Sequence, residues 1–159
     1  MQAETRLYIS TLTYRLVIIN YRFRLMAEAF KNMDHDECVS LTRTIMAILD
    51  GWGLNGAAIM HVLAIPQGVP VRALRRYRDN TPFPDEVAIY ERVEHIIGIA
   101  DALRTTYPHN PPMGVLWLQQ RNKRFADRPP LQVIAENGLQ GLLEVRQHLD
   151  CSYDWHVNP

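Results

Sequence analysis

The helical spacing of apolar residues from position 36 onward constrains the fold of this chain most. Leu41, Ile45, Ile48 and Leu49 recur at positions i, i+4, i+7 and i+8, so they share one face of a helix. A second series over residues 85–107 consists of Ile89, Val93, Ile96, Ala100, Leu103 and Tyr107. On that segment the opposite face carries Glu91, Glu94, Asp101 and Thr105. The sequence therefore predicts an all-α fold.

Caps and breakers divide the helical sequence into elements. Asp34 or Asp36 can cap the first helix, Gly51 can end it, and Asn55 can cap a short second helix. Residues 65–69 predict a turn, and Pro70 suits the first position of a third helix that runs to about residue 80. A break at residues 81–84 precedes the long connecting helix, and further helices are expected at about 112–121, 130–137 and 139–150.

The first residues differ from the rest. Residues 7–25 have some strand propensity and no helical period, and no second strand of similar quality follows to complete a sheet. We interpret residues 1–33 as an N-terminal extension, with the native start at Met26. A genuine N-terminal arm is the alternative.

Composition and charge restrict the class of protein. Apolar residues make up 47% and charged residues 21% of the chain, as in an ordinary globular protein. The 17 basic and 17 acidic side chains cancel, which argues mildly against a nucleic-acid binder unless charge is locally concentrated. Cys38 and Cys151 lie too far apart for a small disulfide scaffold, and no apolar run is long enough to span a bilayer. These features predict a cytoplasmic protein without a membrane segment.

Residues 34–82 carry the local concentration of positive charge. Two short helices joined by a tight turn, with a basic second member, are typical of a helix-turn-helix DNA-binding domain. The arginines expected to point outward and contact DNA are Arg72, Arg75, Arg76 and Arg78. Arginine neutralises phosphates and forms paired hydrogen bonds with guanine in the major groove. A merely solvated helix face is the alternative.

The C-terminal third contains packing and turn residues rather than a catalytic pattern. No glycine-rich phosphate loop or nucleophile motif occurs, so we predict no catalytic residue, no cofactor and no metal site. His148, Cys151 and His156 nevertheless lie close together in sequence, although zinc sites show cleaner ligand pairs. A small helical metalloenzyme that uses these three residues therefore remains an alternative.

Residues 37–155 resemble the Xre/ParS-type antitoxins that partner RES-domain toxins. The resemblance depends mainly on a C-terminal pattern formed by Trp117, Leu118, Asn122, Phe125, Pro130, Leu131, Gly138, Leu142, Val145 and Leu149. Residues 52–54 and the arginine-rich third helix also look like the Xre-like portion of that family. The chain departs from the family near Asp127, where a glycine is common, and in the turn at residues 66–70, which contains more helix breakers.

The resemblance implies a protein with two binding functions and no catalysis of its own. Residues 83–159 would form a helical toxin-binding domain that blocks an NAD-consuming toxin, and residues 151–159 could enter the toxin's pocket; a frayed tail is the alternative. The residues expected to contact the toxin are Trp117, Asn122, Phe125, Tyr153, Asp154 and Trp155. Residues 34–82 would bind the promoter of the protein's own operon as a homodimer and repress it. The alternative is a helix-turn-helix transcription regulator without a toxin partner.

Overall fold

The computed structural model describes the backbone of residues 28–157 and the side chains of residues 28–150. The chain divides into two compact units, Met1–Met33 and Asp34–Pro159. Residues 28–32 of the first unit form a helical turn, in which the N–H of Asn32 donates to the carbonyl oxygen of Glu28 over 3.2 Å. The expected native start at Met26 falls outside the described residues.

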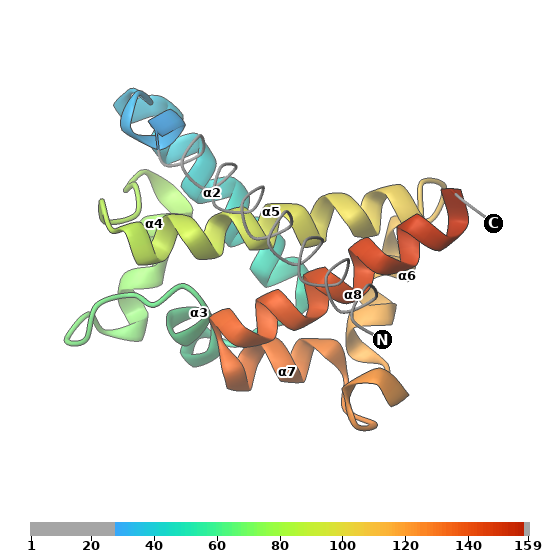
Figure 1. Cartoon of the computed structure of the whole chain (residues 1–159). Coiled ribbons are helices and arrows are strands. Elements are labelled where there is room, and N and C mark those ends of the chain that lie inside the picture. Colours follow the sequence, from blue (N-terminus) through green and yellow to red (C-terminus); the bar gives the residue numbers. More distant parts are fainter. Residues whose placement is uncertain (1–27, 158–159) are drawn as a thin grey trace, which may run out of the picture. The chain divides into compact units, whose positions relative to one another are not determined.

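The second unit is built from helices (Figure 1). In chain order they are α2 (His35–Trp52), α3 (Gly56–Val62), η1 (Val71–Ala73), α4 (Leu74–Asp79), α5 (Val87–Thr106), α6 (Pro111–Gln119), η2 (Lys123–Phe125), α7 (Pro130–Asn137) and α8 (Leu139–Val157). Within residues 28–157 there is no strand. The all-α fold predicted from the sequence is therefore confirmed.

Local signals fix the ends of the first two helices. Asp34 and Glu37 form a capping box, in which each side chain accepts a hydrogen bond from the other residue's backbone N–H over 2.8–2.9 Å. Gly53, with φ of 92°, ends α2 in the left-handed conformation that glycine tolerates best. The prediction that Gly51 ends this helix was wrong, because Gly51 lies inside α2. Asn55 caps α3 as expected, since its side chain accepts from the N–H of Ala58.

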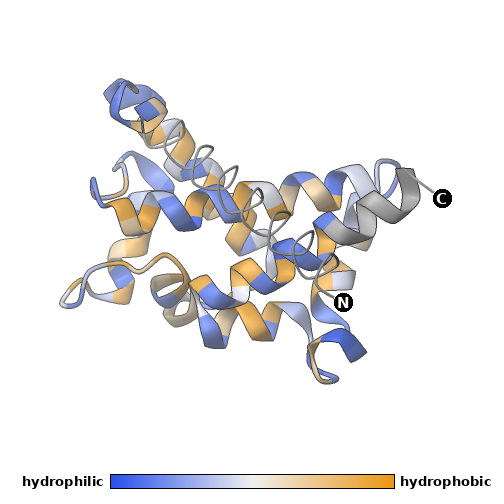
Figure 2. Ribbon diagram, viewed as in Figure 1, coloured by the Kyte–Doolittle hydropathy of each residue, from blue (hydrophilic) through white to orange (hydrophobic). Residues whose placement is uncertain are grey.

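The buried core runs through most of the second unit. Helix α8 packs against α5 and α7, α2 packs against α4, and further contacts join α2 to α5 and α6 and join α3 to α7. Hydrophobic residues gather on the sides of the helices that face one another (Figure 2). Because several of these contacts cross the boundary that the sequence predicts near residue 82, residues 34–82 and 83–159 share one core.

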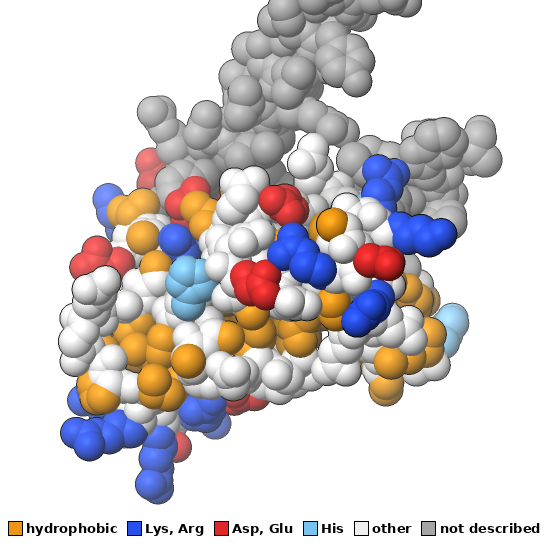
Figure 3. All heavy atoms as spheres, turned by 90° about the horizontal axis from the view of Figure 1, so that it is seen from below, with side chains coloured by type: hydrophobic (Ala, Val, Ile, Leu, Met, Phe, Trp, Pro, Cys, Tyr) orange, Lys and Arg blue, Asp and Glu red, His pale blue; other side chains and the backbone are white. Residues whose placement is uncertain are grey.

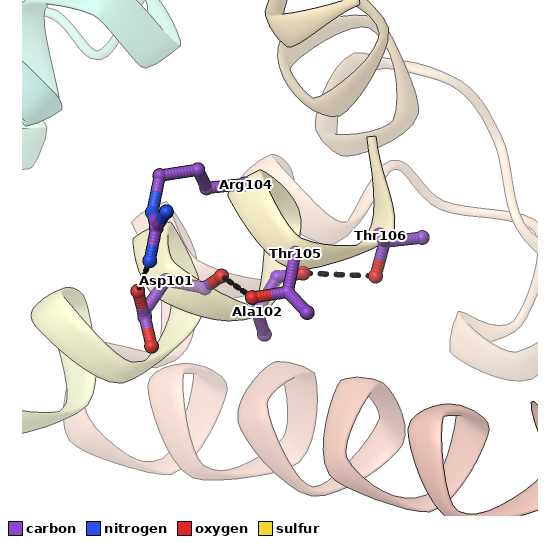
Figure 4. A network of polar contacts seen from close by, with 5 residues as sticks. All are labelled: Asp101, Ala102, Arg104, Thr105 and Thr106. Atoms are coloured by element: carbon purple, nitrogen blue, oxygen red, sulfur yellow. Dashed lines mark hydrogen bonds and ion pairs between the residues drawn. The ribbon is translucent and has the colours of Figure 1, made fainter. Parts of the chain in front are cut away.

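Helix α5 shows how the polar and apolar faces divide. Asp101 and Thr105 lie on its exposed side, where Arg104 pairs with Asp101 over 2.7 Å (Figure 4). The hydroxyls of Thr105 and Thr106 each donate to the carbonyl oxygen four residues earlier. Glu94 does not follow the prediction that placed it on this polar face, because it is buried at 7% exposure.

The end of the chain differs from the expected tail. Residues 151–157 continue α8 as a helix up to the last described residue, Val157. The prediction that this helix ends at about residue 150 was too short, and residues 139–157 contain no proline and only one glycine, Gly141. Among the helices of residues 28–157, none combines the length and apolar character that crossing a membrane requires.

Candidate functional site

The basic surface expected on the third helix is formed by η1 and α4. Leu74 and Tyr77 are buried and hold α4 to the core, and the ring of Tyr77 lies 5.3 Å from that of Phe83. All four predicted arginines, Arg72, Arg75, Arg76 and Arg78, are exposed. Within the described residues the side chains of Arg72, Arg75 and Arg76 form no hydrogen bond or ion pair. Their guanidinium groups are therefore available to an anionic partner.

Arg78, the fourth predicted arginine, is engaged with a residue of α2. Its Nε and Nη2 atoms donate to Oδ2 and Oδ1 of Asp50, each over 2.7 Å. These hydrogen bonds lower the pKa of the Asp50 carboxyl below its usual value and raise that of Arg78. Two parallel charge-assisted bonds fix the direction of both side chains. Arg78 therefore differs structurally from the three arginines near it.

Asp50 and Arg78 also border an open groove of about 590 Å³ between α2 and α4. Its other lining residues, all from α2, are Ser40, Arg43, Thr44, Met46 and Ala47. Positive and negative charges both line this groove, so its electrostatics do not select a small anion.

An aromatic cluster joins α6, η2 and α8. The rings of Trp117 and His148 are stacked at an interplanar angle of 3°, with their centroids 5.8 Å apart. Phe125, which is 7% exposed, packs edge-on against both rings. Its ring centroid lies 5.5 Å from that of His148 and 6.5 Å from that of Trp117. Burial, and secondarily the charge of Arg124, lowers the pKa of His148. Sequence reasoning connected Trp117 with Phe125 but placed His148 in a different candidate set.

Asn122 organises the loop that carries Phe125. Its side chain accepts from the N–H of Arg124 over 3.0 Å, and its carbonyl oxygen accepts from the N–H groups of Phe125 and Asp127. The backbone N–H of Asn122 donates to the carbonyl oxygen of Arg128, and this hydrogen bond closes the loop. Ala126 and Asp127 have φ of 53° and 62° in this loop. Both residues therefore adopt the left-handed backbone conformation, which glycine tolerates better than alanine or aspartate.

Apolar side chains are exposed beside this cluster on α6. Met113 and Leu116 are 39% and 42% exposed, and Trp117 follows at a half-buried position. Positions 113, 116 and 117 lie on one side of a helix because they are separated by three and four residues. One face of the second unit shows hydrophobic side chains gathered between separate groups of Lys and Arg (Figure 3). The exposed apolar side of α6 is a candidate surface for contact with a protein.

A buried polar network lies between α5 and α8. Nη1 of Arg146 donates to Oε1 of Glu94 over 3.3 Å and to Nδ1 of His95 over 3.0 Å. Burial lowers the pKa of His95, and the positive charge of Arg146 lowers it further. Gly98 leaves room for this arginine, because a Cβ atom at position 98 would lie 2.7 Å from its Cζ atom. This network was not predicted from the sequence. The signal for it was the pair of polar residues Glu94 and His95 between the apolar residues Val93 and Ile96.

The remaining candidate residues lie in the last turns of α8. The side chains of Tyr153, Asp154 and Trp155, and those of Cys151 and His156, are outside the described residues. Among the side chains of residues 28–150, no three His, Cys, Asp or Glu residues come together in a way that could hold a metal ion.

The described residues thus define an all-helical protein with a basic short helix and an exposed apolar helix face. A comparison with protein-family models gives no match, and a comparison with curated proteins gives none either.

Proposed function

We propose that this protein is an antitoxin of a type II toxin–antitoxin system. It neutralises a RES-domain toxin by direct binding and represses its own operon as a DNA-binding homodimer in the cytoplasm. The observation that carries the proposal is the short amphipathic helix formed by η1 and α4, with Leu74 and Tyr77 buried and Arg72, Arg75 and Arg76 exposed.

The support for DNA binding comes from the arrangement of α3, η1 and α4. Two short helices separated by the breaker-rich segment 63–70 present a basic second helix to solvent, as helix-turn-helix domains do. Arginine side chains that lack a partner within the described residues provide phosphate contacts and base readout without first breaking an internal bond.

The support for toxin binding is the family resemblance together with the apolar side of α6. Exposed large hydrophobic side chains that lie together favour a protein partner, because leaving them in water is costly. Trp117 extends this surface with a large aromatic ring of the kind that contributes most at interfaces.

DNA binding is tested with the full chain and a labelled fragment of the protein's own promoter. Arg75→Ala and Arg76→Ala should each weaken binding, and loss of one phosphate contact should reduce the log–log salt slope by about 1. Binding that is unchanged in the double variant would exclude α4 as the DNA-contacting element. His61→Ala, on the exposed side of α3, serves as a control that leaves the arginine surface intact.

Toxin binding is tested by co-purification of the full chain with the product of the adjacent gene. Leu116→Glu should abolish co-purification, because a carboxylate at the centre of an apolar contact loses its hydration. Val87→Glu is the matched control, since Val87 is 61% exposed at the start of α5. Promoter binding without any co-purifying toxin would favour the alternative function, a transcription regulator that has no toxin partner.

A further inference from the structure

Helix α4 is too short to hold its own direction. It has six residues, and no side chain caps its start at Ala73. Isolated helices of this length are unstable in water, so tertiary contacts must fix both its formation and its rotation about its own axis. The position of every exposed arginine on η1 and α4 depends on those contacts.

Two kinds of contact anchor α4. Leu74 and Tyr77 bury apolar surface, which attaches the helix but has little directional preference. The pair between Arg78 and Asp50 is directional, because two N–H groups of one planar guanidinium meet two oxygens of one carboxylate. It joins the last turn of α4 to the last turn of α2 across 28 positions of sequence.

We propose that the Asp50–Arg78 pair positions α4 so that Arg75 and Arg76 face the DNA, and that Arg78 itself is a positioning residue rather than a DNA contact. This inference rests on the proposed DNA-binding function. It reassigns one of the four arginines that the sequence predicts as DNA contacts.

Simple electrostatics predicts the opposite effect when Asp50 is removed. Loss of a negative charge near a basic surface favours binding to a polyanion. Asp50 also lies at the C-terminal end of α2, where the helix dipole disfavours a negative charge. If Arg78 contacted phosphate, Asp50→Ala would release it and strengthen DNA binding. If the pair positions α4, the same substitution weakens binding.

The experiment compares Asp50→Ala with Asp79→Ala in promoter binding by the full chain. Asp79 is the matched control, because it is an exposed aspartate at the end of α4 without a partner among the described residues. We expect Asp50→Ala to weaken binding by about fivefold, the effect of losing a modest hydrogen-bonded contact, with the salt slope unchanged. We expect Asp79→Ala to bind at least as tightly as the unmodified chain. Unchanged or tighter binding by Asp50→Ala would overturn the proposal.

A second variant separates the geometry of Arg78 from its charge. Lysine is a good phosphate ligand but cannot form the paired bonds of a guanidinium. Arg78→Lys should therefore weaken promoter binding as much as Asp50→Ala does, and the double variant should be no weaker than either single variant. Full binding by Arg78→Lys would identify position 78 as a phosphate contact and overturn the proposal.

Amide hydrogen exchange distinguishes failure of this inference from failure of the proposed function. Asp50→Ala should lower the protection of the α4 amides, whereas Asp79→Ala should leave it unchanged. If the unmodified chain binds no DNA while Asp50→Ala still lowers protection, the DNA function fails and the anchoring role remains. Equal protection of α4 in all three proteins would overturn the anchoring role.

Discussion

At Gly141, helix α8 lies directly against the backbone of α7. A Cβ atom at this position would overlap the carbonyl oxygen of Val133 and lie 2.8 Å from the Cα atom of Ile134. These are backbone atoms, so they cannot move aside as the end of a flexible side chain can. The close packing of α7 on α8 therefore depends on the absence of a side chain at residue 141.

Gly141→Ala should lower the free energy of unfolding by about 1–3 kcal/mol through overpacking. Gly51→Ala is the matched control, because nothing lies within 4 Å of a Cβ atom there and the residue is inside α2. That substitution should raise stability by about 0.5–1 kcal/mol, since alanine is the better helix former. Urea denaturation of the three proteins measures both effects, and equal stabilities would contradict this account of the α7–α8 contact.

His95 links the stability of the second unit to pH. Burial, together with the charge of Arg146, lowers its pKa in the folded protein, so the folded state favours the neutral ring. Because a guanidinium only donates, Nδ1 of His95 accepts and the proton of the neutral ring sits on Nε2. The stability gained from the neutral ring is complete above the unfolded pKa of about 6.5. It is lost as the pH falls through the lower folded value.

The free energy of unfolding should therefore fall as the pH drops below about 6.5. Replacement of His95 by Gln should flatten this part of the profile, whatever it does to the stability at neutral pH. Urea titrations between neutral and mildly acidic pH give the comparison, with His109→Gln in the exposed turn before α6 as the control. If both variants keep the same slope as the unmodified chain, His95 is not the responsible group.

At the scale of elements, the capping box at the start of α2 depends only on residues of one turn. Asp34→Ala removes a side-chain acceptor from the N–H of Glu37 and should lower the free energy of unfolding by about 1 kcal/mol. Asp36→Ala removes the same negative charge from the first turn but removes no cap, so it should lower the free energy of unfolding by less. Thermal unfolding of both variants measures the two stabilities. A larger loss of stability in Asp36→Ala than in Asp34→Ala would contradict the role of the capping box.

Local signals explain why most helices were predictable. Asp34, Asn55 and Gly138 act within one turn of their own positions, so the sequence alone locates the helices that they begin or end. Burial of Glu94 was not predictable in this way. Its partner Arg146 lies 52 residues away on another helix, and helical periodicity only separates polar from apolar faces.

The candidate sites show the same distinction between local and distant contacts. The exposure of Arg72, Arg75 and Arg76 follows from the helical period of one short segment. The pairing of Arg78 depends on how α4 lies against α2, which no local pattern specifies. His148 joins Trp117 and Phe125 only through the packing of α8 on the preceding elements.

At the scale of the whole molecule, residues 34–159 should unfold as one cooperative unit. The side chain of Gln119 on α6 donates to the carbonyl oxygen of Trp52 at the end of α2 over 3.0 Å. Thr42 on α2 accepts from the N–H of Phe83, which lies just before α5. These bonds cross the boundary that the sequence predicts near residue 82.

Native-state hydrogen exchange tests this cooperativity. The best-protected amides of α2 and α8 should open with the same free energy, and that energy should equal the value from global denaturation. The control for a local effect is Gln119→Ala, which should lower the opening energy of both helices together. Separate opening energies for α2 and α8 would show that residues 34–82 and 83–159 are independent domains.

The contact between Gly98 and Arg146 should also restrict how these two positions vary among related proteins. The guanidinium of Arg146 occupies the space that any larger side chain at position 98 would need. A change at either position alone leaves a clash or an unpaired buried carboxylate at Glu94, so single substitutions there would be selected against. In a lineage of related chains, we expect the glycine and the arginine to be retained together or replaced together, and Glu94 to become neutral when the arginine is lost.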